Sequence, residues 1–255
     1  MRFSARVFFA LAALFPAVQA SAQNAPQTGG VVPFISLSPG TGPIGAYVWG
    51  GYAGTNHYQG GYTGALWAMN GNLLTPGVVF RADFAAGVYT YRGVPPFQSV
   101  RVNTEVGDIM VGYRSALGAG WITGYIGPAV ESHHNPDPAA EPVRGTSAGV
   151  KIQGDVDLPV APNLKFYGMA LYSQPLDTFY AMAKTSSYIS PGISLGPQVS
   201  VFTNDKYSEY RVGPALNFEN VLGRFDVSLS GGYLHPTSGA DGYFAGVFVG
   251  MPFRR

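Results

Sequence analysis

The sequence predicts an all-β fold, namely an antiparallel transmembrane up-and-down β-barrel of about 12 strands, preceded by a signal peptide. Three observations lead to this prediction. A secretory leader opens the chain, apolar and polar residues alternate along about a dozen segments, and the chain contains no cysteine. A period of two is the period of a β-strand whose two faces meet different surroundings. In a membrane barrel the apolar face contacts lipid and the polar face lines the lumen.

The first 22 residues have the features of a signal peptide. Arg2 and Arg6 supply positive charge, Val7–Val18 is an apolar run, and Ala20-Ser21-Ala22 places small residues at the cleavage position. At about 1.5 Å per residue the run is too short to span a ~30 Å hydrocarbon core, which argues against an uncleaved anchor helix. We therefore predict a signal peptide over residues 1–22, a periplasmic lead-in over residues 23–43 and an outer-membrane β-barrel over residues 44–255.

The composition favours strands and excludes several classes of function. The chain has 35 Gly, 16 Tyr and 16 Phe but only 11% charged residues, a mixture that is poor in helix formers. The 15 basic and 14 acidic residues nearly balance, so we predict no nucleic-acid partner. Because cysteine is absent, disulfides and thiol chemistry are excluded. Backbone hydrogen bonds and packing must therefore hold the fold together.

Twelve segments have the alternation of strands, and the connections between them differ in length. The clearest segment is 149–158, in which apolar Val150 and Ile152 alternate with polar Lys151 and Gln153. Short turns alternate with longer, more polar loops, as in bacterial barrels, whose short turns and both termini face the periplasm. The predicted strands are 44–54, 61–70, 77–91, 100–115, 119–131, 145–158, 163–173, 177–187, 191–203, 207–219, 223–234 and 242–253.

The last predicted strand indicates the location of the protein. Alternate apolar residues from Tyr243 to Phe253 form one stripe close to the end of the chain. This stripe resembles the signal that the barrel assembly machinery reads, although Arg254 and Arg255 follow it. We therefore predict the bacterial outer membrane as the location, with outer-membrane lipids and the barrel assembly machinery as partners.

The sequence does not have the pattern of an enzyme. Ser132 adjoins His133, but no nucleophile motif frames the two residues. His133 and His134 beside Asp137 match no standard metal-ligand spacing, so we predict no metal site and no cofactor. These three residues belong to a predicted surface loop, 132–144, and loops on a rigid scaffold commonly carry recognition.

Charged side chains on the predicted lumen faces nearly balance in sign, which argues against an ion-selective constriction. The interpretation that we favour is an ion-pair lattice that fills a narrow barrel, because a lone buried charge is costly. The alternative is a selective channel. The predicted lumen charges are Arg81, Asp83, Asp108, Arg114, Lys151, Asp155, Asp157, Lys184, Glu209, Arg211, Arg224 and Asp226.

A polysaccharide is the ligand class that these faces suit. A glucan offers flat apolar sugar faces to aromatic rings and hydroxyl groups to carboxylates and amides. The alternative is that the aromatic residues form membrane girdles and that the charges are lattice. The candidate polysaccharide-binding residues are Trp49, Trp67, Tyr89, Tyr91, Trp121, Tyr125, Tyr180, Asp83, Asp108, Gln153 and Asp155.

Several short motifs resemble the cellulose biosynthesis protein BcsS family. The most particular ones surround the central hairpin, at Asn135–Pro138, Pro142–Thr146 and Gly149–Lys151. The resemblance runs from about Ala46 to Phe253, and Gln198 departs from the acidic residue expected in that family. Further similar stretches are Gly45–Gly51, Arg81–Phe84, Val111–Tyr113, Tyr172-Ser173, Asp177–Ala181 and Ser194–Pro197.

The resemblance implies an outer-membrane component associated with cellulose synthesis clusters of alphaproteobacteria, with no catalytic residues to carry over. The resulting hypothesis is a non-enzymatic outer-membrane β-barrel accessory to cellulose or exopolysaccharide biosynthesis, export or surface anchoring. Cellulose or cellulose-synthase secretion components would be its partners. The alternative hypothesis is a small-solute channel or a surface adhesin unrelated to cellulose.

Overall fold

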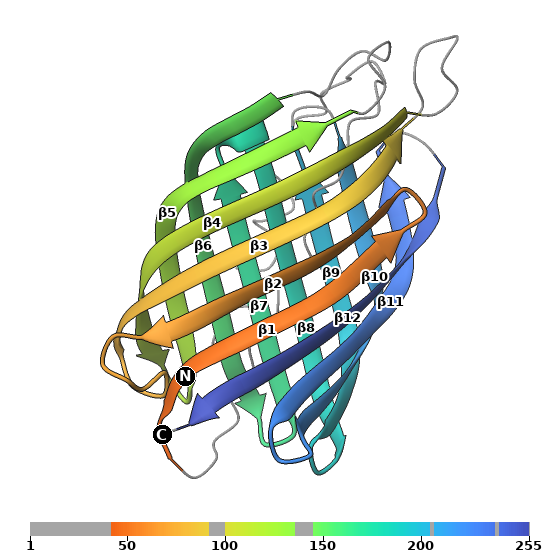
Figure 1. The fold of residues 1–255 in the computed structure, drawn as a ribbon. Coiled ribbons are helices and arrows are strands. Elements are labelled where there is room, and N and C mark those ends of the chain that lie inside the picture. Colours follow the sequence, from red (N-terminus) through yellow and green to blue (C-terminus); the bar gives the residue numbers. More distant parts are fainter. Residues whose placement is uncertain (1–41, 92–99, 136–144, 205–206, 238–239, 255) are drawn as a thin grey trace, which may run out of the picture.

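The computed structural model describes residues 42–91, 100–135, 145–204, 207–237 and 240–254. In this part of the chain twelve antiparallel strands form a closed barrel, because β1 pairs with β12 as well as with β2 (Figure 1). None of its helices is long and apolar enough to cross a membrane. The elements are β1 (Ile44–Thr55), β2 (Tyr58–Ala68), β3 (Gly77–Tyr91), β4 (Val100–Leu117), β5 (Gly120–His134), β6 (Gly145–Ala161), β7 (Leu164–Ser173), the short 3-10 helix η1 (Pro175–Asp177), β8 (Thr178–Ser190), β9 (Ile193–Thr203), β10 (Ser208–Val221), β11 (Phe225–Pro236) and β12 (Gly242–Arg254).

The prediction of about twelve strands is confirmed, and every predicted strand end lies within three residues of the observed one. The strand β5 continues three residues past its predicted end, to His134. The apolar alternation fades there because outward residues such as Ser132 are polar, but backbone pairing with Thr146 of β6 persists. The predicted signal peptide, 1–22, and all but the last two residues of the predicted lead-in, 23–43, lie outside the described residues.

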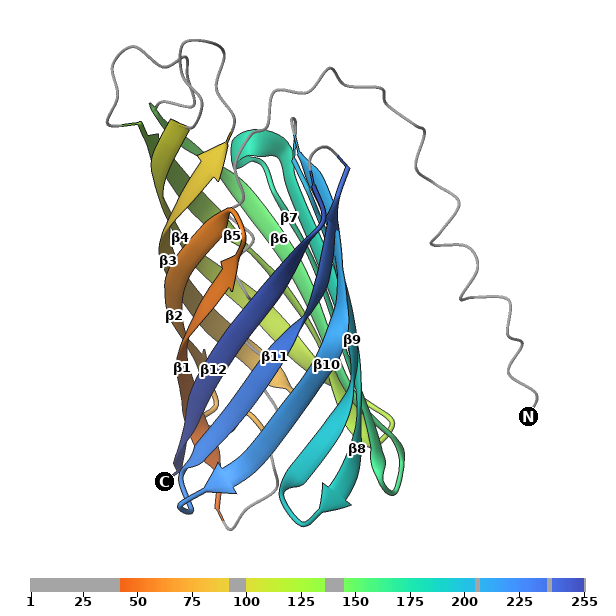
Figure 2. The same ribbon diagram turned by 90° about the vertical axis from the view of Figure 1, so that its right-hand side faces the viewer.

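The connections fall into two sets at opposite ends of the barrel. Ile44 pairs with Arg254, so β1 begins and β12 ends at the same end, which we call the terminal end (Figure 2). The other end is called the loop end. At the terminal end the strands are joined through residues 69–76, 118–119, 162–163, 191–192 and 222–224. At the loop end they are joined through residues 56–57, 92–99, 135–144, 174–177, 204–207 and 237–241.

The outer face of the barrel is apolar and the inner face is polar. On β6, Val150 and Ile152 are exposed on the outside, whereas Lys151 and Gln153 are buried inside. An apolar outer belt on a closed barrel is the arrangement that contacts the hydrocarbon of a membrane. Other large apolar side chains exposed on this belt are Phe84, Ile109, Val111, Ile122, Ile126, Leu195, Val199, Leu229, Val247 and Val249.

Inward aromatic rings lie against inward glycines of the neighbouring strand. A Cβ atom at Gly64 would come within 2.5 Å of the Trp49 ring, and one at Gly112 within 2.6 Å of the Tyr125 ring. Glycine in a strand permits this close approach because it has no side chain. Large rings therefore fit inside the barrel without pushing its strands apart.

The turn between β2 and β3 folds back into the lumen at the terminal end. Leu73 is fully buried, and its backbone N–H donates to the Ile44 carbonyl at 2.7 Å. The Asn72 side-chain oxygen accepts from the Leu74 N–H at 3.0 Å, which fixes the turn. The apolar cluster around Leu73 comprises Ile44, Tyr47, Trp49, Leu66, Ala68, Val79, Met110, Tyr125 and Phe248.

Candidate functional site

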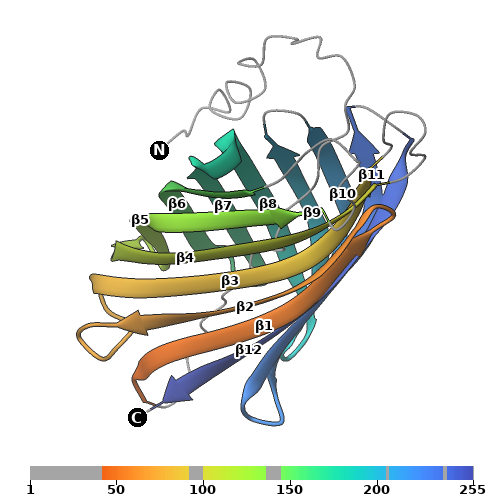
Figure 3. The same ribbon diagram turned by 45° about the horizontal axis from the view of Figure 1, so that its top comes forward.

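The lumen is enclosed by two walls with different chemistry. In Figure 3, β3–β5 lie in front of the lumen and β8–β10 lie behind it. Around β3–β6 the inward side chains are mostly charged, and we call this group the Arg81 network. Around β8–β11 they are mostly hydroxyls and amides, and we call this group the Asn217 network. The Arg81 network consists of Arg81, Asp83, Asp108, Lys151, Gln153 and Asp155, and the Asn217 network of Lys184, Ser186, Ser194, Asn217 and Ser228.

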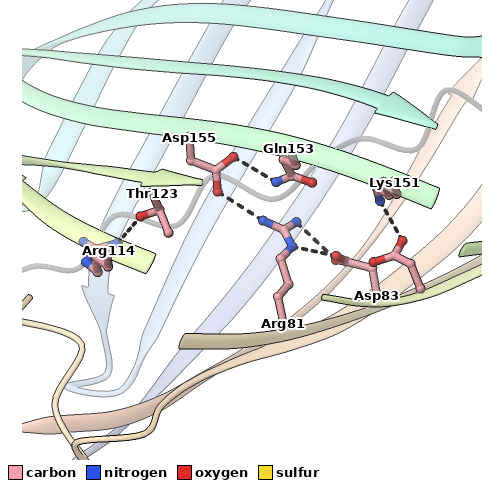
Figure 4. A network of polar contacts seen from close by, with 8 residues as sticks. Arg81, Asp83, Arg114, Thr123, Lys151, Gln153 and Asp155 are labelled. Carbon is pink, nitrogen blue, oxygen red and sulfur yellow. Dashed lines mark hydrogen bonds and ion pairs between the residues drawn. The ribbon is translucent and has the colours of Figure 1, made fainter. Parts of the chain in front are cut away.

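The centre of the Arg81 network is a buried guanidinium held by two carboxylates (Figure 4). Arg81 is only 1% exposed. Its Nε lies 2.6 Å from Asp83 Oδ2, its Nη2 donates to Asp83 Oδ1 at 3.2 Å, and its Nη1 lies 3.2 Å from Asp155 Oδ2. A buried charge requires this kind of pairing, since an unpaired one would be strongly destabilising. The strands β3 and β6 are not neighbours, so the Arg81 side chain crosses part of the interior.

Two more contacts extend the network along β6. The Gln153 amide donates to Asp155 Oδ1 at 2.8 Å, and Lys151 Nζ lies 2.6 Å from Asp108 Oδ2 on β4. The remaining oxygens, Asp108 Oδ1 and Gln153 Oε1, are buried without a hydrogen-bond partner among the described residues. The network therefore keeps unused hydrogen-bonding capacity.

Aromatic rings complete the surroundings of the Arg81 guanidinium. Its Cζ lies 5.1 Å from the Trp49 ring centroid and 5.5 Å from the Tyr125 ring centroid, which is the range of cation–π contacts. Trp49 and Tyr125 were predicted as polysaccharide-binding residues. The structure places both rings inside the barrel, next to the cation.

The Asn217 network joins four consecutive strands through one amide. Asn217 Oδ1 accepts from Lys184 Nζ at 2.8 Å and from the Ser228 hydroxyl at 2.8 Å. Its Nδ2 donates to Ser186 Oγ at 3.1 Å and to Ser194 Oγ at 3.2 Å. Every donor and acceptor of this buried amide is therefore used.

Most of the other predicted lumen charges are also paired. Arg211 pairs with Glu209 on the same strand, and the Tyr207 hydroxyl donates to the second Glu209 oxygen at 2.9 Å. The Tyr47 hydroxyl donates to Asp226 Oδ2 at 3.0 Å. The prediction for Arg224 was wrong, because it lies exposed in the turn after β10 rather than on a strand face.

Trp67, a predicted polysaccharide-binding residue, lies on the outer face and not in the lumen. It is 38% exposed and stacks on Phe80 of β3, with ring centroids 5.7 Å apart. Both faces of β2 consist largely of glycine, small and apolar residues, so its alternation did not reveal which side points inward. Tyr91 is the last residue of β3, and the structure does not describe the position of its side chain.

The two histidines predicted in a surface loop both belong to β5. His133 faces inward and is buried, with Nε2 at 2.9 Å from Glu131 Oε1 and Nδ1 at 3.2 Å from the Tyr89 hydroxyl. His134 is the exposed last residue of the strand. Asp137 lies outside the described residues. Within the described ranges no group of three His, Asp or Glu side chains could hold a metal ion.

The remaining two aromatic candidates also point inward. Tyr180 is buried in an apolar cluster with Phe202 and Tyr207. Trp121 faces the lumen near the terminal end, and Arg114 Cζ lies 4.6 Å from its ring centroid. Arg114 was predicted only as a lumen charge, and its contact with Trp121 follows from the pairing of Ala116 with Trp121, which brings the two strands into register.

Comparisons with known proteins agree with the barrel fold. A family model described as cellulose biosynthesis protein BcsS matches residues 47–253. A search of curated proteins finds no match.

Three solved structures illustrate the similarity of fold. The KdgM porin in complex with disordered oligogalacturonate has a TM-score of 0.50 at 7% identity, over 82% of this chain and 99% of that one. The COG4313 outer membrane channel from Pseudomonas putida F1 has a TM-score of 0.50 at 12% identity, over 86% and 100%. The translocator domain of the autotransporter NalP from Neisseria meningitidis has a TM-score of 0.49 at 14% identity, over 84% and 90%. At these identities the first two show the fold alone, that of an outer-membrane β-barrel.

Proposed function

Because the chain belongs to the cellulose biosynthesis protein BcsS family, we propose that this outer-membrane β-barrel is a non-enzymatic accessory that anchors or retains cellulose at the cell surface. The observation that carries the proposal is the Arg81 network. Its ion pairs join β3 to β6 and β4 to β6, and thus cross the interior between strands that are not neighbours. A glucan chain that passed through the lumen would have to break these buried pairs, which is costly. Retention at the surface needs no such passage.

A deletion strain tests the proposal directly. Cellulose that stays with the cells and cellulose released into the medium are measured separately by dye binding. We expect the retained fraction to fall while total synthesis continues, and the full-length gene in trans to restore it. Unchanged retention in the deletion strain would contradict the proposal.

The alternative is a small-solute channel, which is favoured by the fold similarity to a porin and to an outer-membrane channel. Planar bilayers containing the refolded protein separate the two functions. The proposal expects no steady conductance steps from the wild-type protein. Regular steps that disappear when a neutral sugar is added would favour the channel, and cell adhesion that is lost without any change in cellulose would favour an adhesin.

A further inference from the structure

A small pocket opens in the lumen between β4, β5, β6 and β7, close to the terminal end. Arg114, Trp121, Tyr125, Asp155, Asp157 and Tyr167 are among the residues that line it. Arg114 lies three residues before the end of β4, and Trp121 is the second residue of β5, so both are near the turn that joins these strands. The enclosed space has room for about one water-sized polar group.

Arg114 brings unused donors to this pocket. The residue is only 6% exposed, and among the described residues its guanidinium makes one hydrogen bond, from Nη1 to Thr123 Oγ1 at 3.4 Å, near the limit of such bonds. Its Nε and Nη2 are buried and have no partner among the described residues. The Trp121 ring lies beside the guanidinium, with Arg114 Cζ 4.6 Å from the ring centroid. A buried donor without an acceptor is costly, so a ligand that supplies an acceptor would be favoured here.

Asp157 brings unused acceptors to the same pocket. It lies opposite Trp121 in the β5–β6 pairing and faces inward. Within the described part of the chain its carboxylate makes no hydrogen bond and no ion pair, and the cations that attract it from a longer distance include Lys165 and Arg114. The pocket thus presents donors on one side and acceptors on the other, and among the described residues no hydrogen bond or ion pair joins Arg114 to Asp157.

The charges of the lining residues disfavour a charged ligand and favour a neutral one. An anion would be repelled by Asp155 and Asp157, and a cation by Arg114. A hydroxyl group is neutral and both donates and accepts, so it can satisfy Arg114 and Asp157 together. The rings of Trp121, Tyr125 and Tyr167 add flat apolar surface beside it. Hydroxyl groups carried on a ring with flat apolar faces are characteristic of a neutral sugar.

We propose that this pocket is a binding subsite for one hydroxyl or hydroxymethyl group of a neutral glucan. The sugar ring that carries the group lies against the aromatic surface at the pocket mouth. The inference rests on the proposed function and names a point of contact for its substrate. Short turns and both termini face the periplasm in bacterial barrels, so the subsite would hold the periplasmic part of an anchored glucan, which needs no passage through the lumen.

The test uses the full-length chain without its leader, refolded in detergent micelles, with cellohexaose as the probe. Isothermal titration measures the dissociation constant. We expect Asp157→Ala and Arg114→Lys each to weaken binding by roughly tenfold, since each removes hydrogen bonds between a charged group and the sugar. Asp241→Ala removes an exposed carboxylate at the loop end, serves as the matched control, and should bind like the wild type.

Two controls accompany the titration, one for folding of the variants and one for the specificity of binding. Heat-modifiable gel migration identifies folded protein, and Asp157→Ala should fold because its carboxylate makes no hydrogen bond or ion pair with another described residue. Oligogalacturonate of the same length, which carries carboxylates, should bind more weakly than cellohexaose.

Three outcomes would overturn the subsite: wild-type protein that does not bind cellohexaose, folded variants that bind it unchanged, or equal affinity for the charged oligomer. None of them bears on cellulose retention by cells, which tests the proposed function independently.

Discussion

The two walls of the lumen differ in the side chains that pair their buried polar groups. In the Asn217 network one neutral amide makes five hydrogen bonds and leaves none of its own atoms unpaired. In the Arg81 network full charges are paired, yet Asp108 Oδ1 and Gln153 Oε1 are buried without partners among the described residues. The nearby Arg114 has two unpaired nitrogens.

This difference separates a network whose central amide is fully paired from one whose members keep unpaired atoms, although Thr178 Oγ1 on β8 is also buried without a partner among the described residues. Buried polar groups normally have a hydrogen-bond partner. A buried polar group without one is therefore not accounted for by its role in stabilising the fold. The unpaired atoms of the Arg81 network and of Arg114 lie on β4 and β6. The wall built around Asn217 is therefore expected to serve stability, and the wall built around Arg81 to serve both stability and binding.

Replacement of the central cation should have the largest effect. Arg81→Met leaves Asp83 and Asp155 buried without their cation, and we expect a loss of roughly 3–5 kcal/mol in the free energy of unfolding. Urea unfolding of the refolded protein in micelles measures this loss. Adding Asp155→Asn should recover part of it. A single variant as stable as the wild type would remove the basis for calling the Arg81 network a structural lattice.

Replacement of Asn217, the central amide of the Asn217 network, should lower the free energy of unfolding by less. Asn217→Ala leaves Lys184 and three serine hydroxyls with lost partners but no buried unpaired carboxylate, and we expect a loss of roughly 2 kcal/mol. The same unfolding assay applies. If this variant proves less stable than Arg81→Met, hydroxyls and amides rather than charges hold the barrel together, and the comparison of the two walls is reversed.

A third change leaves all charges in place and tests the packing beside Arg81. In Gly64→Ala the new methyl group would lie 2.5 Å from the Trp49 ring and 2.7 Å from the Ala82 carbonyl oxygen. Overpacking of this kind costs about 1–3 kcal/mol, and we expect the upper half of that range because the Ala82 backbone carbonyl cannot move aside as a flexible side chain could. Gly154→Ala is the control, since its methyl group would meet nothing within 4 Å. Equal melting temperatures for the two variants would disprove the packing argument.

The smallest effect is expected from a charge outside the lumen. Hydrogen bonds from the Tyr233 hydroxyl and the His235 ring hold the pKa of the exposed Asp241 carboxyl below its ordinary value. Because the pKa is lowered in the folded state, the stabilisation is present above the ordinary aspartate pKa and is lost as the pH falls through the lowered value. NMR titration of the Asp241 carboxyl carbon should show the lowered midpoint. Tyr233→Phe should move the midpoint back up, and an unchanged midpoint in that variant would refute the cause.

The fold was predictable because alternation along a strand reports its two surroundings directly. On β6, Val150 to Leu158 alternate with Lys151 to Asp157, and the outward and inward faces follow without ambiguity. The same logic gave no direction for β2, where glycine, alanine and aromatic residues occur on both faces, so the sequence did not assign Trp67 to either face. Beyond the membrane belt the alternation stops, which is why His133 was assigned to a loop rather than to the inner face of β5.

The site was less predictable because its contacts depend on strand register. Arg81 and Asp155 are 74 positions apart, and only the pairing of β3 through β6 brings them together. The sequence identified both as lumen charges but contained no signal for their partnership. The juxtaposition of Arg114, Trp121 and Asp157 across three strands likewise follows from register alone.

The closure between β1 and β12 constrains how the barrel forms. Every other strand pairing joins neighbours along the chain, whereas this one brings Ile44 to Arg254. The Tyr47 hydroxyl bond to Asp226 and the Tyr62 hydroxyl bond to the Val247 carbonyl span 179 and 185 residues across this junction. Contacts of such high contact order form slowly, because the entropy of closing a long loop must be lost first. Until they form, β1 and β12 are open edges that hydrocarbon does not tolerate, so ring closure and membrane insertion must proceed as one coupled step.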